Sequence, residues 1–359
     1  MTGKDRIKRI LKHEPVDRIG FCEYFWSDTL KEYVREGFMK PDELYEDHFN
    51  LDIQRFKPFN LTIDLDFKEQ VVKETDTTRL VRDGNGATLL RHKLHDASHQ
   101  QVEFTVKEKK DWERVKDILE FKYPDERRID FEGYRKAKAI AEKAGRFFCC
   151  EDFGPFALTH PVSGIENVLF GMGMEPEWIA EMAETYARML IRLQEVLFER
   201  EGYPDGVWYC DDLGYKQQPF MSPSMYREII FPVHVQLVDH AHRHGLQVVL
   251  HCCGFVEPLL PHVIETGIDC LQAIEVKAGM DLLRIHNNYG NRLALMGGID
   301  VTTLITNDKK RIDAELESKI PIVKNGYGYV LHSDHSIPKA VSYDTLNYYI
   351  QKGLALGTY

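Results

Sequence analysis

The chain has 359 residues, of which 43% are hydrophobic and 29% are charged. This composition excludes a disordered protein and allows one large domain or two medium ones. The formal net charge of −11, without a long basic run, argues against sequence-independent binding of nucleic acid. No stretch approaches the roughly 20 consecutive apolar residues of a membrane helix, and the N-terminus lacks the apolar core of a signal peptide. We therefore expect no nucleic-acid and no membrane partner.

The cysteines indicate the redox compartment. Their number is odd, most stand in apolar stretches, and in a chain of this size they do not form a disulfide framework. We therefore predict a reducing, cytoplasmic compartment. The seven residues are Cys22, Cys149, Cys150, Cys210, Cys252, Cys253 and Cys270.

The first hundred residues combine a helix, a strand and a β-rich segment. Residues 4–13 are predicted as a short amphipathic helix and residues 18–25 as a first buried strand. Residues 61–107 contain several strand-like runs and few helix signals. Within them, Asp83-Gly84-Asn85-Gly86 is typical of a tight turn between two strands. We predict that 61–107 is a β-meander inserted as a rim of the fold.

From about residue 132, short apolar runs alternate with helical stretches. Strands are predicted at 146–154, 206–212, 247–254, 268–275, 292–300 and 326–335. Helices are predicted at 176–200, 222–244, 255–267, 280–288, 308–324 and 342–355, with Pro176 in a first turn, Ser222 as an N-cap and Gly245 at a helix end. This alternation implies parallel strands joined by helical crossovers.

The strand number then predicts the fold class. Six strands, with one or two before them, favour an α/β fold of the (β/α)₈ barrel type that takes up the whole chain, 1–359, as a single domain. A doubly wound sheet is the alternative. It usually carries a glycine-rich phosphate loop after an early strand, and neither G-x-G-x-x-G after a strand nor G-x-x-x-x-G-K-[ST] occurs here.

Polar residues follow the predicted strands. The C-terminal ends of the strands of a parallel barrel meet at one mouth, where the chemistry of such enzymes takes place. Six polar strand ends in succession therefore predict a catalytic mouth. They are Glu151-Asp152, Asp211-Asp212, His251-Cys252-Cys253, Gln272 to Glu275, Gly297-Gly298-Ile299-Asp300 and His332-Ser333-Asp334-His335.

His251 and Cys253 are predicted to be a pair of metal ligands. Side chains alternate along a strand, so these two point the same way while Cys252 points into the packing. Imidazole and thiolate both bind zinc, which needs at least three protein ligands. His335 is the first candidate for the third ligand and Glu275 the next, followed by the Asp211-Asp212 pair. A buried cysteine beside a hydrogen-bonded histidine is the alternative interpretation.

Asp211 and Asp212 are predicted catalytic residues, which donate a proton or orient the substrate. Their alternative is a cap on the following loop. Tyr24, Trp26, Tyr215 and Glu275 are predicted to bind substrate, with Phe153 as a further aromatic wall. Four histidines on one predicted helix are interpreted as structural, because three of them lie in its last turns, where they favour the helix dipole. These are His234, His240, His242 and His244.

Six segments between about 146 and 355 together resemble the uroporphyrinogen decarboxylase superfamily, and the resemblance implies a (β/α)₈ barrel. They stand in the order expected of that superfamily. They are Asp211-Asp212-Leu213-Gly214, Met221-Ser222-Pro223-Ser224-Met225-Tyr226-Arg227, Leu250-His251-Cys252-Cys253-Gly254, Glu265-Thr266-Gly267-Ile268-Asp269, Ala278-Gly279-Met280-Asp281 and Leu295-Met296-Gly297-Gly298-Ile299-Asp300.

The resemblance implies one of two activities. True decarboxylases of the superfamily carry an arginine-rich signature that would fall near residues 20–30, where this chain has Phe21-Cys22-Glu23-Tyr24-Phe25-Trp26-Ser27-Asp28 and no arginine. The branch of zinc methyltransferases has His-x-Cys after one strand and a cysteine after the last. His251 and Cys253 match the first part, whereas no cysteine follows Cys270 and His335 stands at about the expected place. The chain therefore looks closer to the methyltransferases.

The expected ligand set predicts the substrate class. One thiolate and two imidazoles leave more positive charge on zinc than two thiolates do, which suits a Lewis acid acting on oxygen. We therefore expect a zinc-dependent methyltransferase that moves a methyl group from a small methyl ether or alcohol to reduced cobalt on a corrinoid protein. The alternatives are a metal-free decarboxylase acting on a small or tetrapyrrole carboxylate and a non-catalytic tetrapyrrole-binding protein. A homodimer is compatible with this interpretation.

Overall fold

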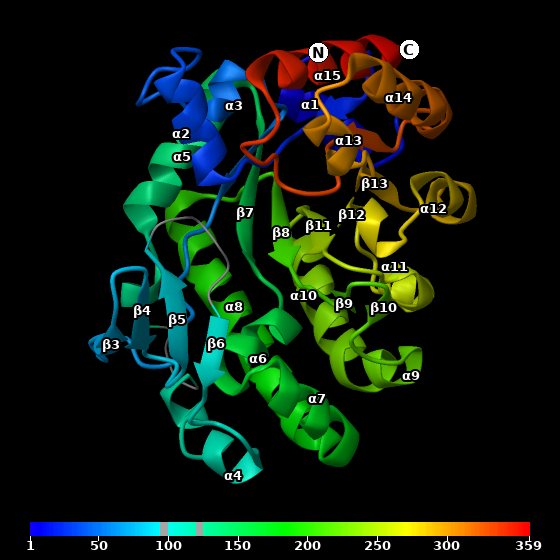
Figure 1. Cartoon of the computed structure of the whole chain (residues 1–359). Coiled ribbons are helices and arrows are strands. Elements are labelled where there is room, and N and C mark those ends of the chain that lie inside the picture. Colours follow the sequence, from blue (N-terminus) through cyan, green and yellow to red (C-terminus); the bar gives the residue numbers. More distant parts are fainter. Residues whose placement is uncertain (94–99, 120–124) are drawn as a thin grey trace.

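Eight parallel strands form the centre of the fold in a computed structural model that describes residues 1–93, 100–119 and 125–359 (Figure 1). They follow the order β1-β14-β13-β12-β11-β8-β7-β2. The backbone N–H of Asp52, beside β2, donates to the carbonyl of Phe21 in β1 at 2.8 Å and so links the two ends of this order. The strands are β1 (Gly20–Phe21), β2 (Ile53–Phe56), β7 (Phe147–Phe153), β8 (Gly206–Cys210), β11 (Gln247–Cys252), β12 (Cys270–Ala273), β13 (Ala294–Gly297) and β14 (Tyr329–Leu331).

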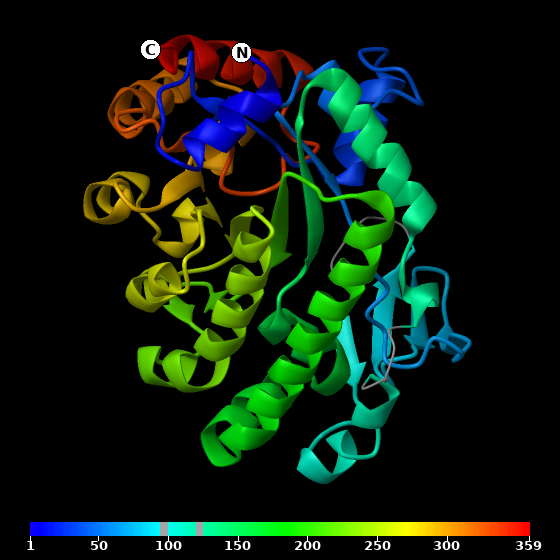
Figure 2. The same cartoon turned by 180° about the vertical axis from the view of Figure 1, so that it is seen from behind.

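This arrangement confirms the predicted (β/α)₈ barrel. All six strands predicted after residue 132 are present, and two more precede them, although β1 is shorter than the predicted 18–25. Figure 2 shows the helices packed around the outside of the sheet. They are α1 (Gly3–Ile10), α2 (Ser27–Arg35), α3 (Tyr45–His48), α4 (Lys109–Trp112), α5 (Phe131–Ala144), α6 (Pro155–Ser163), α7 (Ile165–Met174), α8 (Pro176–Glu201), α9 (Pro223–Met225), α10 (Phe231–Arg243), α11 (Leu260–Glu265), α12 (Leu282–Tyr289), α13 (Val301–Ile305), α14 (Lys309–Val323) and α15 (Tyr343–Leu356).

The helix signals of the sequence have the expected local causes. Pro176 is the first residue of α8, where its missing N–H has no partner to lose. The Ser222 hydroxyl accepts a hydrogen bond from the N–H of Met225 at 3.2 Å, as an N-cap does. The predicted helix 222–244 differs in one respect, because a π-helical turn at Tyr226–Ile230 separates α9 from α10.

The barrel interior is apolar away from the mouth. Ile7 and Ile10 of α1 pack with inward-facing residues of the strands, among them Phe147, Trp208 and Met296. At the same end, the buried carboxylate of Asp52 is bonded to two arginines, Arg6 at 2.7 Å and Arg18 at 2.8 Å. Helix α1 therefore closes the N-terminal end of the barrel, and the polar strand ends lie at the opposite end.

The predicted β-meander is confirmed within the described residues. It is an antiparallel sheet in the order β3-β4-β5-β6. The turn at 83–86 joins β4 to β5, and Gly86 there has φ +75°, where a Cβ would lie 2.1 Å from the hydroxyl oxygen of Thr105. The part of the prediction that covers 94–99 lies outside the described residues. The strands are β3 (Gln70–Glu74), β4 (Thr78–Arg82), β5 (Thr88–His92) and β6 (Gln100–Glu103).

Candidate functional site

Two loops at the barrel mouth approach each other through glycines. A Cβ on Gly214, which follows β8, would lie 2.5 Å from the carbonyl oxygen of Cys253, and one on Gly254 would lie 2.4 Å from the carbonyl carbon of Gly214. Gly254 also has φ +77°, which side chains other than glycine rarely adopt. Because neither position has room for a side chain, the backbones after β8 and β11 pack directly together. This contact brings Asp212 next to Cys253.

Asp212, His251 and Cys253 form a cluster of three side chains at this contact. Their ligand atoms all lie within 4.8 Å of one another, and no other such group of three is found among the residues that the structure describes. His251 Nε2 lies 3.3 Å from Cys253 Sγ and 3.5 Å from Asp212 Oδ1. Zinc bonds of about 2.0 to 2.3 Å at a tetrahedral angle place neighbouring ligand atoms roughly 3.3 to 3.8 Å apart. The donor atoms of the cluster and the two distances from His251 Nε2 therefore fit a zinc ion.

Side chains alternate at the end of β11 as predicted. The nitrogen of His251 and the sulfur of Cys253 face each other, whereas Cys252 is buried on the opposite side, where its sulfur accepts the N–H of Leu213 at 3.1 Å. Cys252 thus holds the loop after β8 from behind. All seven cysteines are free, so the expectation that they form no disulfide framework is confirmed.

The thiol of Cys253 is held in its protonated form by its surroundings. Burial raises the pKa of Cys253 well above its ordinary value, and the nearby carboxylates of Asp212 and Glu275 add to this effect. The N–H of Cys253 donates to Asp212 Oδ1 at 2.9 Å, which fixes that carboxylate beside the sulfur. A bound cation would replace the thiol proton, because metal ligands must be deprotonated.

His335 and Glu275 lie near the cluster without belonging to it. The imidazole of His335 stacks on Trp26 with ring centroids 6.0 Å apart, and burial lowers the pKa of His335. Both oxygens of Glu275 are engaged, one by the N–H of Gly254 at 2.7 Å and the other by Lys277 at 3.2 Å. Among the candidates for the third ligand, the structure therefore groups Asp212 with His251 and Cys253.

Asp211 points away from the mouth. Its fully buried carboxylate accepts the N–H groups of Phe156 and Ala157 in the first turn of α6, at 3.3 and 2.6 Å. It is also bonded to His234 Nε2 at 2.7 Å, and His234 Nδ1 lies 2.9 Å from the hydroxyl of Tyr226. Asp211 therefore ties α6 and α10 to the end of β8. These contacts agree with a structural role for His234.

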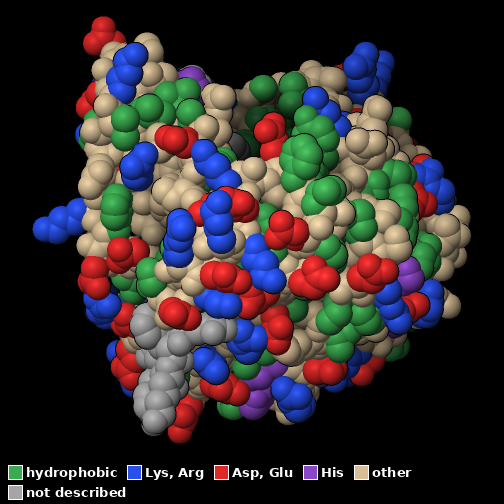
Figure 3. Space-filling view, turned by 90° about the horizontal axis from the view of Figure 1, so that it is seen from below, with side chains coloured by type: hydrophobic (Ala, Val, Ile, Leu, Met, Phe, Trp, Pro, Cys, Tyr) green, Lys and Arg blue, Asp and Glu red, His purple; other side chains and the backbone are tan. Residues whose placement is uncertain are grey.

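The predicted aromatic residues occupy two different places. Tyr24 lies inside the barrel, edge-on to Trp208 with ring centroids 5.9 Å apart. Trp26 and Tyr215 lie on the rim, where Tyr215 is half exposed and packs against Phe220. Figure 3, which looks onto the mouth, shows acidic and apolar side chains around a hollow at one side of this face. Tyr24 is thus a wall of the interior and the other two belong to the entrance.

Arg55 was not among the predicted site residues. Its guanidinium carbon lies 3.2 Å from the ring centroid of Tyr24, and its Nη1 lies 3.1 Å from the carboxylate of Glu151. Arg55 stands in β2, a strand of four residues without a run of apolar side chains, so periodicity did not reveal it. The interior next to the cluster is therefore both aromatic and charged.

Asp152, the neighbour of Glu151, points out of the barrel and supplies a pH-dependent stability term. Burial raises the pKa of Asp152 from 3.8 to about 7, and one oxygen of this carboxyl has no hydrogen-bond partner. A raised pKa in the folded state means that its contribution to stability is full below the unfolded pKa and is lost as pH rises through the folded one. We therefore expect the free energy of unfolding of the wild-type protein to fall between about pH 5 and about pH 8. The variant Asp152→Asn should lack this part of the pH dependence.

Urea unfolding of both proteins at these two pH values measures the effect. Asp17→Asn is the control without a pH effect in this range. The hydrogen bond from Arg6 holds the pKa of Asp17 below its ordinary range, so the stability that Asp17 contributes is already full at pH 5. The difference between this variant and the wild-type protein should therefore be the same at both pH values. Equal pH dependence of the wild-type protein and Asp152→Asn would show that Asp152 is not protonated in the folded state.

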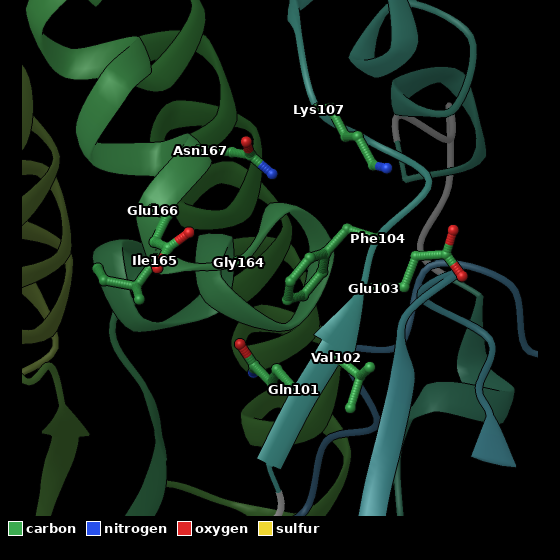
Figure 4. Close-up of a pocket in the computed structure, with 9 residues that line it drawn as sticks. All are labelled: Gln101, Val102, Glu103, Phe104, Lys107, Gly164, Ile165, Glu166 and Asn167. Atoms are coloured by element: carbon green, nitrogen blue, oxygen red, sulfur yellow. The ribbon is translucent and has the colours of Figure 1, made fainter. Parts of the chain in front are cut away.

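A second hollow lies outside the mouth cluster. A pocket of about 480 Å³ lies between the end of β6 and the first turn of α7. Figure 4 shows the residues that line it. Its polar side chains include Glu103, Lys107 and Glu166, and none of the predicted site residues lines it.

None of the helices in the described part of the chain has the length and the apolar run that a membrane span requires.

Comparisons with known proteins place the chain in a family. The family model described as "Uroporphyrinogen decarboxylase (URO-D)" matches residues 152–352, more than half of the chain. The chain is 24% identical over 153 residues to a "Methylated-thiol--coenzyme M methyltransferase" of Methanosarcina mazei, a match over 43% of this chain and only 39% of that protein. A solved "methyltransferase from Methanosarcina mazei" has the same fold, with a TM-score of 0.68 and 18% identity over 99% of this chain and 98% of that one. The chain therefore belongs to the uroporphyrinogen decarboxylase family.

Proposed function

We propose that the protein is a zinc-dependent methyltransferase that moves a methyl group from a small methyl ether or alcohol to a corrinoid protein. The observation that carries the proposal is the cluster of Asp212, His251 and Cys253, whose donor atoms and spacing suit zinc. Three protein ligands leave a fourth position for a substrate atom, as in catalytic zinc sites. The names of the two relatives from Methanosarcina mazei support methyl transfer as the reaction class.

The donor set favours an oxygen as the substrate atom. With Asp212 in place of His335, the deprotonated set would carry two negative charges, as two thiolates do, so the charge left on zinc no longer distinguishes the two sets. A carboxylate oxygen is a harder and less electron-donating ligand than a second thiolate. When bound, zinc would supply a Lewis acid that stabilises the oxygen leaving the methyl group. A site with one sulfur therefore suits an ether or alcohol better than a methylated thiol.

The surrounding residues have separate tasks in this proposal. Tyr24, whose ring centroid lies 5.3 Å from that of His332, would enclose the apolar part of the donor. Trp26 and Tyr215 at the rim would exclude water when the donor is bound. The side chain of Asp212 is 49% exposed, so the cluster is reachable from the mouth, as a protein-bound acceptor requires. Neither Asp211, which is fully buried, nor Glu275, whose oxygens are both bonded, is available to transfer a proton.

The test combines metal analysis with a screen of methyl donors. Zinc-loaded protein is mixed with reduced cobalamin and, in separate reactions, with methanol, methyl ethers or methylated thiols. We expect about one zinc per chain and methylation of cobalamin by an oxygen donor. The change in the absorbance of cobalamin measures this methylation. Methylation by thiols alone would overturn the substrate class. Absence of zinc together with release of CO₂ from a carboxylate would favour the metal-free decarboxylase. A corrinoid partner, a homodimer and a cytoplasmic location stay predictions.

A further inference from the structure

A chain of buried polar side chains connects His251 to the other side of the barrel. His251 and Gln272 are partners in the register of β11 and β12, and Nδ1 of His251 is hydrogen-bonded to Oε1 of Gln272. Nε2 of Gln272 lies 3.4 Å from Nε2 of His332, at the end of β14. Nδ1 of His332 in turn lies 3.3 Å from Oε1 of Glu23, after β1. The ends of four strands, β1, β11, β12 and β14, are thus linked through side chains.

Glu23, at the far end of this series of hydrogen-bonded side chains, is held by several partners. Glu23 is fully buried and accepts hydrogen bonds from the N–H and the hydroxyl of Ser333 at 2.9 and 2.8 Å, and from the hydroxyl of Tyr349 at 3.3 Å. His332 and Gln272 are also buried, so water cannot replace their partners. Buried polar groups of this kind adopt the single arrangement that satisfies all of them.

With the oxygen of Gln272 toward His251 and its nitrogen toward His332, the chemistry of each group fixes the positions of the protons. An amide oxygen only accepts, so the proton of neutral His251 sits on Nδ1, and its Nε2 presents a lone pair. An amide nitrogen only donates, so Nε2 of His332 is unprotonated. The proton of His332 is then on Nδ1, where the carbonyl of Ser333 and the carboxyl of Glu23 accept it. Burial, which lowers the pKa of His332 to about 3, agrees with a neutral ring.

We propose that Gln272 and His332 are positioning residues, which hold His251 in the tautomer whose Nε2 lone pair faces Cys253 and Asp212. Glu23 anchors the outer end. The inference rests on the proposed function, since it concerns the ligand that would bind zinc. Outer partners of metal-bound histidines set ring orientation and tautomer, and their loss typically lowers metal affinity about 10- to 100-fold. None of the three residues touches the metal position, so they act through His251.

The first test is nitrogen-15 NMR of the histidine rings in the metal-free protein. We expect His251 to be protonated at Nδ1 in the wild-type protein and to lose this preference in Gln272→Leu. Protonation of wild-type His251 at Nε2 would overturn the proposal. This readout requires neither zinc nor activity. Because the spectrum of the wild-type protein alone can overturn the proposal, the test remains decisive if Gln272→Leu fails to fold.

The second test is the affinity for zinc. Gln272→Leu should weaken binding about 10- to 100-fold, whereas Gln272→Glu should recover most of the affinity because a carboxylate still accepts from Nδ1. His240→Gln is the matched control, since His240 is a buried histidine of α10 outside this chain of contacts. Wild-type affinity in Gln272→Leu would contradict the positioning role. Absence of zinc from the wild-type protein would instead contradict the proposed function and leave the NMR result to decide the positioning role.

Discussion

Replacing Cys253 by serine is expected to reduce the zinc content from about one ion per chain to almost none. Cys253 is the sole sulfur in the cluster, and its sulfur lies 3.3 Å from His251 Nε2. A serine hydroxyl is a poor substitute for a thiolate, and two remaining protein ligands do not make a zinc site. Methyl transfer should fall at least roughly 100-fold with the metal. Metal analysis after dialysis against a defined concentration of free zinc measures the effect.

Cys252→Ser provides the matched control for this variant. Cys252 is the direct neighbour of Cys253. Its side chain is buried and points to the opposite side of β11, toward the N–H of Leu213. It should keep wild-type zinc content at some cost in stability. Equal zinc in the wild-type protein and Cys253→Ser, or equal loss in both cysteine variants, would contradict the assignment of Cys253 as a ligand.

The two adjacent aspartates are expected to behave in opposite ways. Asp211→Asn should lower the free energy of unfolding by about 3 kcal/mol, because it breaks a buried pair with His234 and weakens the acceptor at the start of α6. Asp212→Asn should leave stability nearly unchanged, since Asp212 is half exposed, but should lower zinc affinity and methyl transfer. Urea unfolding and zinc titration of both variants separate the two roles.

Each aspartate variant is the control for the other. If Asp211→Asn lost zinc affinity while keeping wild-type stability, Asp211 would be the functional residue of the pair. If Asp212→Asn bound zinc as tightly as the wild-type protein, the cluster would lack its third ligand and His335 would return as the candidate.

Local patterns predicted much of the fold and two of the three cluster residues. The six strands after residue 132 are buried on both faces, so each appears in the sequence as an apolar run bounded by turns. The common direction of His251 and Cys253 follows from the two-residue period of a strand, which needs no knowledge of the rest of the fold. By contrast, β2 is short and carries Gln54 and Arg55, so no apolar run marks it.

The third member of the cluster depends on contacts between distant segments. Asp212 reaches Cys253 because Gly214 and Gly254 allow two backbones to touch, and the sequence alone does not show that these glycines meet. Asp211 is buried because His234, 23 residues away, turns toward it from α10. Glu23 was not among the predicted site residues. A lone acidic residue in the apolar run at 18–25 is the signal that could have indicated it, and its buried partners come from the other end of the chain.

The most direct test of the central claim is a crystal structure of the zinc-loaded protein with anomalous diffraction measured at the zinc edge. We predict one strong peak at the barrel mouth, about 2.0 to 2.3 Å from His251 Nε2, Cys253 Sγ and a carboxylate oxygen of Asp212. A peak bound to other residues, or no peak at saturating zinc, would contradict the account.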